Sequence, residues 1–217
     1  SLVLRQNISV VGAGRTDAGV HARMMAAHFD VLQELDELSL LVDKLNGMLS
    51  KYIVIHKIIP VNKNAHARFS ALARTYKYMV SEKKNPFNYE YVYRTSLRKI
   101  DFDAMNEACK ALLEYTDFTS FSKLHTDVKT NNCRIDEAKW EYDGEIWTFT
   151  IKADRFLRNM VRAIVGTLFE VGRGKISIDD FRKIIEAKDR SKAGTSAPAE
   201  GLALTGIDYP DYIFVDY

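Results

Sequence analysis

The stretch that decides the fold is Gly12–Ala22, which reads GAGRTDAGVHA. The apolar residues before it predict a strand over Leu2–Val11 that ends in this turn. The three glycines of the turn allow positive φ angles and let a ligand come close to the backbone. Asp17 is the single carboxylate of the turn, and Arg15 lies two residues before it. A strand that ends in a glycine-rich loop with one acid indicates an active site.

Two other interpretations of this loop remain open on its spacing alone. A dinucleotide-binding loop has the pattern G-x-G-x-x-G, in which pyrophosphate lies on a helix N-terminus. Gly12 and Gly14 fit that pattern, but Asp17 replaces the third glycine, and its charge repels phosphate. No Lys-Ser/Thr pair follows to complete a P-loop. In the second interpretation, Asp17 only accepts hydrogen bonds within its own turn, as aspartates in turns often do.

The composition limits the class of protein. The 217 residues are 47% hydrophobic, which is enough for a core in one or two domains. The 31 Lys and Arg nearly balance the 29 Asp and Glu, so a nucleic-acid site must come from local clusters of basic residues. Cys109 and Cys133 lack a metal-type spacing and fit reduced thiols in a cytoplasmic protein. The histidines are scattered and no apolar run approaches a membrane span of about 20 residues, so we expect neither a metal site nor a membrane anchor.

Apolar periodicity predicts the secondary structure along the chain. Helical spacing indicates four helices, Asp36–Leu49, Asp101–Leu113, Phe156–Val171 and Ile178–Ala187. Strands are expected over Met24–Val31, Tyr52–Ile59, Arg74–Met79 and Tyr89–Arg94, in a hairpin of Ala138–Tyr142 and Ile146–Ala153, and from Ala199–Leu202 onward. An Asp-Gly pair forms the turn of the hairpin. Ser177 is the expected N-cap of the fourth helix.

The strand that begins at Arg74 carries a second candidate site. Its alternation places Arg74, Tyr76 and Tyr78 on one face. An arginine with two aromatic rings on one sheet face can hold a phosphate and stack an unpaired base. Tyrosine also packs well in any strand, so the pattern alone leaves both interpretations open.

Basic residues gather in two further places. The loop Lys123–Arg134 is polar and basic, and it is either an RNA contact or a solvated loop. The third predicted helix carries three arginines, which are either solvated helix charges or part of a site: Arg155, Arg158 and Arg162.

Three segments, in this order, closely resemble the motifs of the tRNA pseudouridine synthase A (TruA) family. They are the Asp17 loop, the sequence RTYKY at 74–78 and the sequence FLRNMVRAIVG at 156–166. The resemblance covers essentially the whole chain and is far more specific than a glycine pattern. It departs at the front, where family members have a further strand and helix. We expect this chain to lack that piece, which leaves a sheet edge open beside the Asp17 loop.

The resemblance implies an α+β pseudouridine synthase fold, with two RRM-like halves that share a mixed, mainly antiparallel sheet with a central cleft. The halves are expected at residues 1–88, with the Asp17 loop, and 89–217, with the arginine helix. The implied reaction is the isomerisation of uridine to pseudouridine at positions 38–40 of the tRNA anticodon stem-loop. The implied enzyme is a cytoplasmic homodimer that needs no cofactor and no metal.

The resemblance also assigns residues to this reaction. Asp17 is the essential carboxylate, and Arg162 pairs with it and favours its ionised form. Tyr76 contacts the target uridine and is placed to accept the C5 proton, while the second tyrosine of its motif is left to the core. Leu202 lines the base pocket opposite Tyr76. Arg15 fills the space that the flipped base leaves, or binds phosphate.

Two other classes of protein are consistent with parts of the sequence. An RRM-like RNA-binding module without catalysis explains Tyr76 and the basic loop, but leaves Asp17 without a role. A nucleotide-cofactor oxidoreductase explains Gly12 and Gly14. Saturable binding of NAD favours the oxidoreductase, and RNA binding that is indifferent to replacement of Asp17 favours the binding module.

Overall fold

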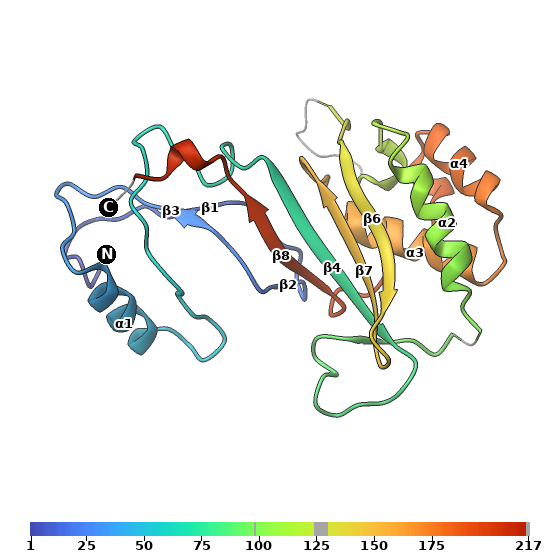
Figure 1. Cartoon of the computed structure of the whole chain (residues 1–217), viewed down its shortest axis with the longest axis horizontal. Coiled ribbons are helices and arrows are strands. Elements are labelled where there is room, and N and C mark those ends of the chain that lie inside the picture. The colour runs from blue at the N-terminus through green and yellow to red at the C-terminus, as the bar shows by residue number, and fades with distance from the viewer. Residues whose placement is uncertain (98, 124–129, 216–217) are drawn as a thin grey trace. The chain divides into compact units, whose positions relative to one another are not determined.

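The computed structural model describes residues 1–97, 99–123 and 130–215, and the chain forms two compact units (Figure 1). The first unit contains Ser1–Gly14, Ala26–Ala71 and the chain from Tyr209 onward. The second unit contains Arg15–Met25 and Leu72–Asp208. The chain therefore passes from one unit to the other within the glycine-rich stretch, and Asp17 belongs to the second unit. The sequence-based division at residue 88 stays a prediction.

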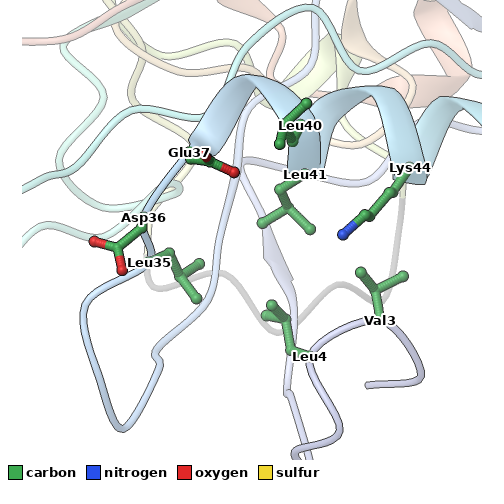
Figure 2. Close-up of a pocket in the computed structure, with 8 residues that line it drawn as sticks. All are labelled: Val3, Leu4, Leu35, Asp36, Glu37, Leu40, Leu41 and Lys44. Carbon is green, nitrogen blue, oxygen red and sulfur yellow. The ribbon is translucent and has the colours of Figure 1, made fainter.

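The first unit has little regular structure. Strands β1 (Val11–Gly12) and β3 (Ala27–His28) pair antiparallel in a two-stranded sheet, and helix α1 spans Leu38–Met48. Only Leu41 of α1 is buried. Beside it lies a cavity of about 150 Å³, between the helix, the turn that precedes it and the residues at the start of the chain (Figure 2).

Two strand predictions in this unit were wrong. The expected strand Leu2–Val11 is regular only at Val11, and its partner is β3 rather than a strand of the large sheet. Residues 52–59 form no strand. A strand needs a neighbour to take its backbone hydrogen bonds, and here the side chain of Asn46 bonds both the N–H and the C=O of Ile55 instead, at 2.7 and 2.9 Å.

The second unit is built on a six-stranded mixed sheet, as the resemblance implied. The strand order is β2 (His21–Ala22), β8 (Leu202–Asp208), β4 (Ala73–Ser81), β7 (Trp147–Ala153) and β6 (Ile135–Tyr142), with β5 (Tyr93–Arg94) beside the end of β4. The pairs β8–β4, β4–β7 and β7–β6 are antiparallel, and β2–β8 and β4–β5 are parallel. The RRM-like character of the two halves stays a prediction.

The Asp-Gly hairpin forms between β6 and β7. Its loop has four residues rather than two, because Tyr142 pairs with Trp147. The carboxylate of Asp143 accepts hydrogen bonds from the backbone N–H groups of Glu145 and Ile146, at 2.9 and 2.7 Å. Gly144 adopts φ 101°, a conformation that glycine takes without strain.

Helices α2 (Phe102–Leu112), α3 (Met160–Gly172) and α4 (Ile178–Glu186) lie together on one face of this sheet (Figure 1). The predicted cap of α4 is confirmed, since Ser177 and Asp180 form a reciprocal capping box. The third helix begins later than expected. Asn159 is left-handed, with φ 64°, so Arg158 and the residues before it precede the helix.

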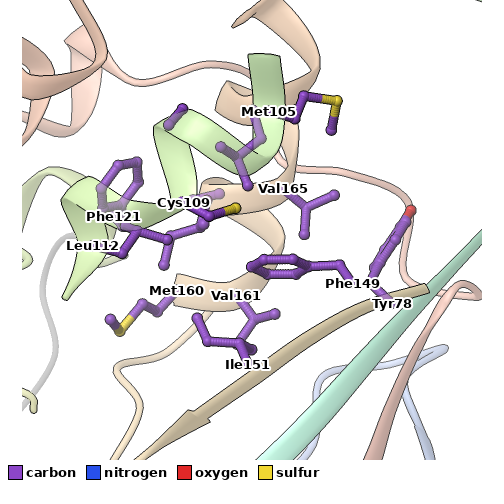
Figure 3. Packing of buried hydrophobic residues seen from close by; sticks show 14 of the residues in the cluster. Tyr78, Met105, Cys109, Leu112, Phe121, Phe149, Ile151, Met160, Val161 and Val165 are labelled. Carbon is purple, nitrogen blue, oxygen red and sulfur yellow. The ribbon is translucent and has the colours of Figure 1, made fainter. Parts of the chain in front are cut away.

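The core lies between the sheet and these helices (Figure 3). Tyr78 and Phe149 contribute fully buried rings from β4 and β7, and Cys109 contributes a buried thiol from α2. The prediction that Tyr78 is a core residue is confirmed, and its hydroxyl donates to the carbonyl of Pro198 at 2.9 Å. Burial raises the pKa of both thiols, that of Cys133 to about 12, which fits small buried hydrophobic residues.

Candidate active site

The Asp17 loop is fixed against the start of β8. The backbone N–H of Val20 donates to the carbonyl of Asp17 at 3.0 Å, and β2 then pairs in parallel with β8. Gly19 has φ 79°, and a Cβ there would lie 3.2 Å from the Cβ of Ala199. Glycine at this position therefore serves both the turn and the close approach of the two segments. As a result, the Asp17 side chain faces the start of α3.

Two arginines lie at the carboxylate of Asp17. Arg162 Nη1 is 3.8 Å from Asp17 Oδ2, and Arg158 Nε is 3.8 Å from Asp17 Oδ1. Both distances are ion-pair contacts that exceed hydrogen-bond length. The two arginines differ in exposure, because the side chain of Arg162 is 21% exposed and that of Arg158 is 60% exposed. The sequence placed Arg162 beside Asp17, but assigned Arg158 no contact with it.

Arg162 is held from behind by the segment that leads to β8. Its Nε donates to the carbonyl of Ala197 at 2.7 Å, and the Ala197 N–H donates to the carbonyl of Arg162 at 2.9 Å. The same segment passes directly over α3, since a Cβ on Gly166 would lie 1.8 Å from the carbonyl oxygen of Thr195. Only a glycine on the helix allows this contact. The guanidinium of Arg162 is therefore positioned by backbone, and its charge is free to act on Asp17.

Tyr76 lies on β4, where burial raises its pKa and the charge of Asp17 contributes to the rise. Its ring makes an edge-to-face contact with Phe156, with 5.2 Å between centroids. Burial raises the pKa of Tyr76, the charge of Asp17 raises it further, and the charge of Arg74 lowers it. Tyr76 is therefore a neutral phenol with a ring that is partly accessible. The Arg74 guanidinium donates to the carbonyl of Asp154 at 2.9 Å.

The other two predicted site residues stand apart from this group. Leu202, the first residue of β8, is 5% exposed, pairs with Tyr78 and packs into the hydrophobic core. Arg15 is exposed on the loop before Asp17. Neither of these residues lines the cavity at Asp17, and Tyr76 is not part of its lining either.

A cavity of about 750 Å³ opens at Asp17. Its lining holds one acid and four basic side chains, together with small and polar residues: Asp17, Ala18, Lys123, Arg158, Asn159, Arg162, Arg190 and Ser196. Lys123 comes from the predicted basic loop, and its N–H donates to the carbonyl of Arg158 at 3.1 Å. The rest of that loop between Lys123 and Thr130 lies outside the described residues.

Sequence reasoning did not single out three residues of this lining. Ser196 lies within the Gly/Ser/Ala stretch Lys192–Ala199, whose composition indicates only a loop, and Arg190 lies just before it. Asn159 lies between two arginines of its motif and has no pattern of its own. Asn159 and Ser196 are 37 positions apart, so no local pattern marks their hydrogen bond. The bond from Arg190 to Ser196 spans only six positions, but it matches no recognised sequence motif. Among the described residues, no cluster of His, Cys, Asp and Glu could hold a metal ion. No helix in the described part of the chain is long and apolar enough to cross a membrane.

Comparisons with known proteins found a matching family model and several relatives. A family model described as tRNA pseudouridine synthase matches residues 108–210. A protein of Parabacteroides distasonis is 61% identical over 214 residues, which cover 99% of this chain and 84% of the relative. A protein of Bacteroides fragilis is 58% identical over 97% of this chain and 84% of its own length. A more distant relative, from Bacillus licheniformis, is 39% identical over 94% of this chain and 83% of its own length. All three relatives are named tRNA pseudouridine synthase A.

Proposed function

This chain belongs to the tRNA pseudouridine synthase A family, and from that membership we propose that it isomerises uridine to pseudouridine at positions 38–40 of the tRNA anticodon stem-loop. The observation that carries the proposal is the ion pair of Asp17 with Arg162 at a cavity lined by basic residues. The guanidinium of Arg162 places a fixed positive charge beside the carboxylate that the reaction needs. An excess of positive charge in the lining suits a polyanion such as RNA.

The target uridine has to leave its stack before it can react. Unstacking costs a few kcal/mol and is offset by contacts in a pocket. A cavity of about 750 Å³ lies in the size range of small-molecule sites and can accept a nucleotide. We place Tyr76 as the ring that contacts the base, with Leu202 on the opposite side. Arg15, on the exposed part of the loop, fills the vacated stack or binds a backbone phosphate.

The reaction then exchanges one bond to the ribose for another. The bond between N1 and C1′ breaks, the uracil rotates, a bond forms between C5 and C1′, the C5 proton leaves and N1 gains a proton. Asp17 assists the first step either as a nucleophile at C1′ or C6 or by promoting elimination. Tyr76, a neutral phenol with a raised pKa, is a weak base. It can take the C5 proton only while it passes its own proton to another acceptor.

The remaining parts of the proposal concern the whole enzyme. We propose that the halves 1–88 and 89–217 are RRM-like, that the enzyme is a cytoplasmic homodimer and that tRNA lies across both subunits. The mixed sheet with helices on one face supports the proposed fold. The names of the relatives support tRNA as the substrate.

The decisive experiment measures release of the C5 hydrogen from tRNA labelled at uridine C5. We expect Asp17→Asn to lower the rate by about 10³-fold or more, since the variant removes the charge but keeps the shape. Binding of tRNA should persist, because phosphate contacts dominate affinity. Asp30→Asn is the matched control, as Asp30 is an exposed carboxylate of the first unit, and it should release hydrogen at the wild-type rate.

Two results would contradict the proposal. Full hydrogen release by Asp17→Asn would remove Asp17 from the chemistry. RNA binding without any hydrogen release by the wild-type protein would favour a non-catalytic RNA-binding module. Substrates in which cytidine replaces uridine at positions 38, 39 or 40, one at a time, test which positions react.

A further inference from the structure

The lining of the Asp17 cavity carries more positive charge than its one carboxylate can balance. Lys123, Arg158, Arg162 and Arg190 face a single acid. Arg162 is committed to Asp17 by its backbone contacts. Among the described residues, no carboxylate oxygen lies within 4.0 Å of the guanidinium of Arg190. The cavity is therefore complementary to an anion beyond what Asp17 supplies.

The hydroxyl of Ser196 is oriented by two donors. Its Oγ accepts a hydrogen bond from Asn159 Nδ2 at 2.6 Å and another from Arg190 Nη2 at 3.0 Å. A serine hydroxyl has two acceptor lone pairs and one proton to donate. With both lone pairs engaged, the only hydrogen bond left to Ser196 is one that it donates. The hydroxyl lines the cavity, so its remaining partner must be an acceptor.

Arg190 is fixed in a way that supports this donor. Its guanidinium donates to the carbonyl of Gly194 at 3.2 Å, to that of Ala193 at 3.4 Å and to Ser196. The positive charge of Arg190 polarises the hydroxyl that accepts from it, which strengthens the hydrogen bond that Ser196 can donate. These contacts preorganise the hydroxyl before any ligand binds.

Arg158 differs from Arg162 in its freedom to move. Its side chain is 60% exposed, and its contact with Asp17 is a 3.8 Å ion pair rather than a hydrogen bond. An arginine fork binds a phosphate through two parallel hydrogen bonds. Exchange of a loose contact with Asp17 for a direct contact with phosphate is therefore favourable for Arg158, while Arg162 remains paired with the carboxylate.

We propose that Ser196 and Arg158 form a subsite for one backbone phosphodiester of the RNA, the one next to the flipped uridine. The subsite rests on the proposed function, and it adds a role for the Arg190–Ser196–Asn159 cluster. Ser196 donates one oriented hydrogen bond to a phosphate oxygen, and Arg158 supplies the charge. The phosphate thereby fixes the ribose of the target nucleotide relative to Asp17.

The test pairs protein variants with a modified RNA. The RNA is an anticodon stem-loop in which a neutral methylphosphonate replaces the phosphate on one side, then the other, of the target uridine. At one of the two positions, we expect the wild-type protein to bind this RNA roughly tenfold to hundredfold more weakly than the unmodified RNA, since a hydrogen bond to a charged group is lost. Ser196→Ala and Arg158→Gln should bind the unmodified RNA more weakly and lose little further affinity on methylphosphonate substitution at that position.

Three controls separate binding from structure. Ser191→Ala, an exposed serine of the same segment, should behave as wild type. Ser196→Thr keeps a hydroxyl and should restore most of the affinity that Ser196→Ala loses. The midpoint of thermal unfolding reports whether Ser196→Ala has disturbed the start of α3 instead.

The outcomes are distinct. If Ser196→Ala shows the same penalty for methylphosphonate as the wild-type protein at both positions, the subsite is wrong. If inorganic phosphate binds at the cavity but neither methylphosphonate changes RNA affinity, the site takes a free anion and the RNA assignment is overturned. Failure of the proposed isomerisation would appear separately, as absence of C5-hydrogen release by wild-type protein that still discriminates the two RNAs.

Discussion

The two units of this chain differ in how well they bury their apolar side chains. The second unit buries a continuous cluster of hydrophobic residues between a six-stranded sheet and three helices. The first unit, taken by itself, leaves large apolar side chains exposed, among them Leu32, Tyr52 and Phe69, at 90%, 77% and 76%. The two units therefore pack their apolar side chains very differently, because a strand or helix is stabilised by the surface it covers more than by its own sequence.

The candidate site follows the same division. Asp17, its two arginines and Tyr76 all belong to the second unit, as does the segment that holds Arg162. The comparison predicts that substitutions of matched chemistry have large effects in the second unit and small ones in the first. Four pairs of variants test it.

The largest effect is expected from Tyr76→Phe. The variant keeps the ring but loses a neutral hydroxyl near Asp17, so turnover should fall by roughly 10²–10⁴-fold, the range for a proton-transfer group, while tRNA binding changes little. Tyr52→Phe, at an exposed tyrosine of the first unit, should leave turnover unchanged. Single-turnover rates and filter binding measure the two quantities. Equal turnover by Tyr76→Phe and wild type would limit Tyr76 to packing.

The pH titration of tyrosine absorbance is a second measurement on Tyr76→Phe. The pKa of Tyr76 is raised in the folded protein, chiefly by burial, from its usual value of 10.0. The neutral hydroxyl therefore contributes its full stability below about pH 10, and that stability is lost as the pH rises through the folded pKa. Tyrosine absorbance should show one late-titrating group fewer in Tyr76→Phe. An unchanged titration would contradict the burial of this hydroxyl.

The next largest effect is expected in the core of the second unit. Phe149→Ala removes a fully buried ring and should lower the free energy of unfolding by about 3–5 kcal/mol. Leu41→Ala, in α1, should cost less than about 2 kcal/mol, because Leu41 already borders a cavity. Urea denaturation followed by hydrogen exchange in each unit measures both. A larger loss for Leu41→Ala would mean that the first unit is packed more tightly than its exposed residues indicate.

The two units also differ in the space around a helical glycine, Gly166 in α3 and Gly47 in α1. A Cβ at Gly166 would overlap the carbonyl of Thr195, so Gly166→Ala should cost on the order of 3 kcal/mol and shift the segment that holds Arg162. Gly47, in α1, has open space around it, and Gly47→Ala should gain up to about 1 kcal/mol from helix propensity. Thermal unfolding gives the sign of each change. A stable Gly166→Ala with full turnover would show that the segment can move aside.

The smallest effects are expected at the helix caps. Ser177→Ala removes the capping box of α4 and should cost about 1 kcal/mol. At the start of α1, Glu37 is left-handed, with φ 53°, and makes no side-chain cap. Glu37→Asn should gain less than about 1 kcal/mol, because asparagine tolerates this conformation and can cap the helix. A free energy of unfolding of Glu37→Asn that is lower than that of the wild-type protein would contradict this expectation.

The sequence by itself predicted a candidate catalytic carboxylate and most of the regular elements of the second unit. The glycine-rich stretch made Asp17 a candidate, and the alternation from Arg74 predicted the strand that is observed as β4. The caps at Ser177 and the Asp-Gly turn were predicted because their hydrogen bonds join residues within four positions of one another. Such local bonds leave a local pattern of residue types.

Only the tertiary structure decided which segments meet. The sequence could not indicate that residues 52–59 lack a strand partner, that Arg158 also reaches Asp17, or that Arg190 and Asn159 converge on Ser196. The contacts of Arg158 with Asp17 and of Asn159 with Ser196 join positions far apart along the chain, and their energy depends on the geometry of the sheet and helices that carry them. A polar residue in a loop has the same local sequence signature whether it faces solvent or a binding cavity, so the difference emerges only when the chain has folded.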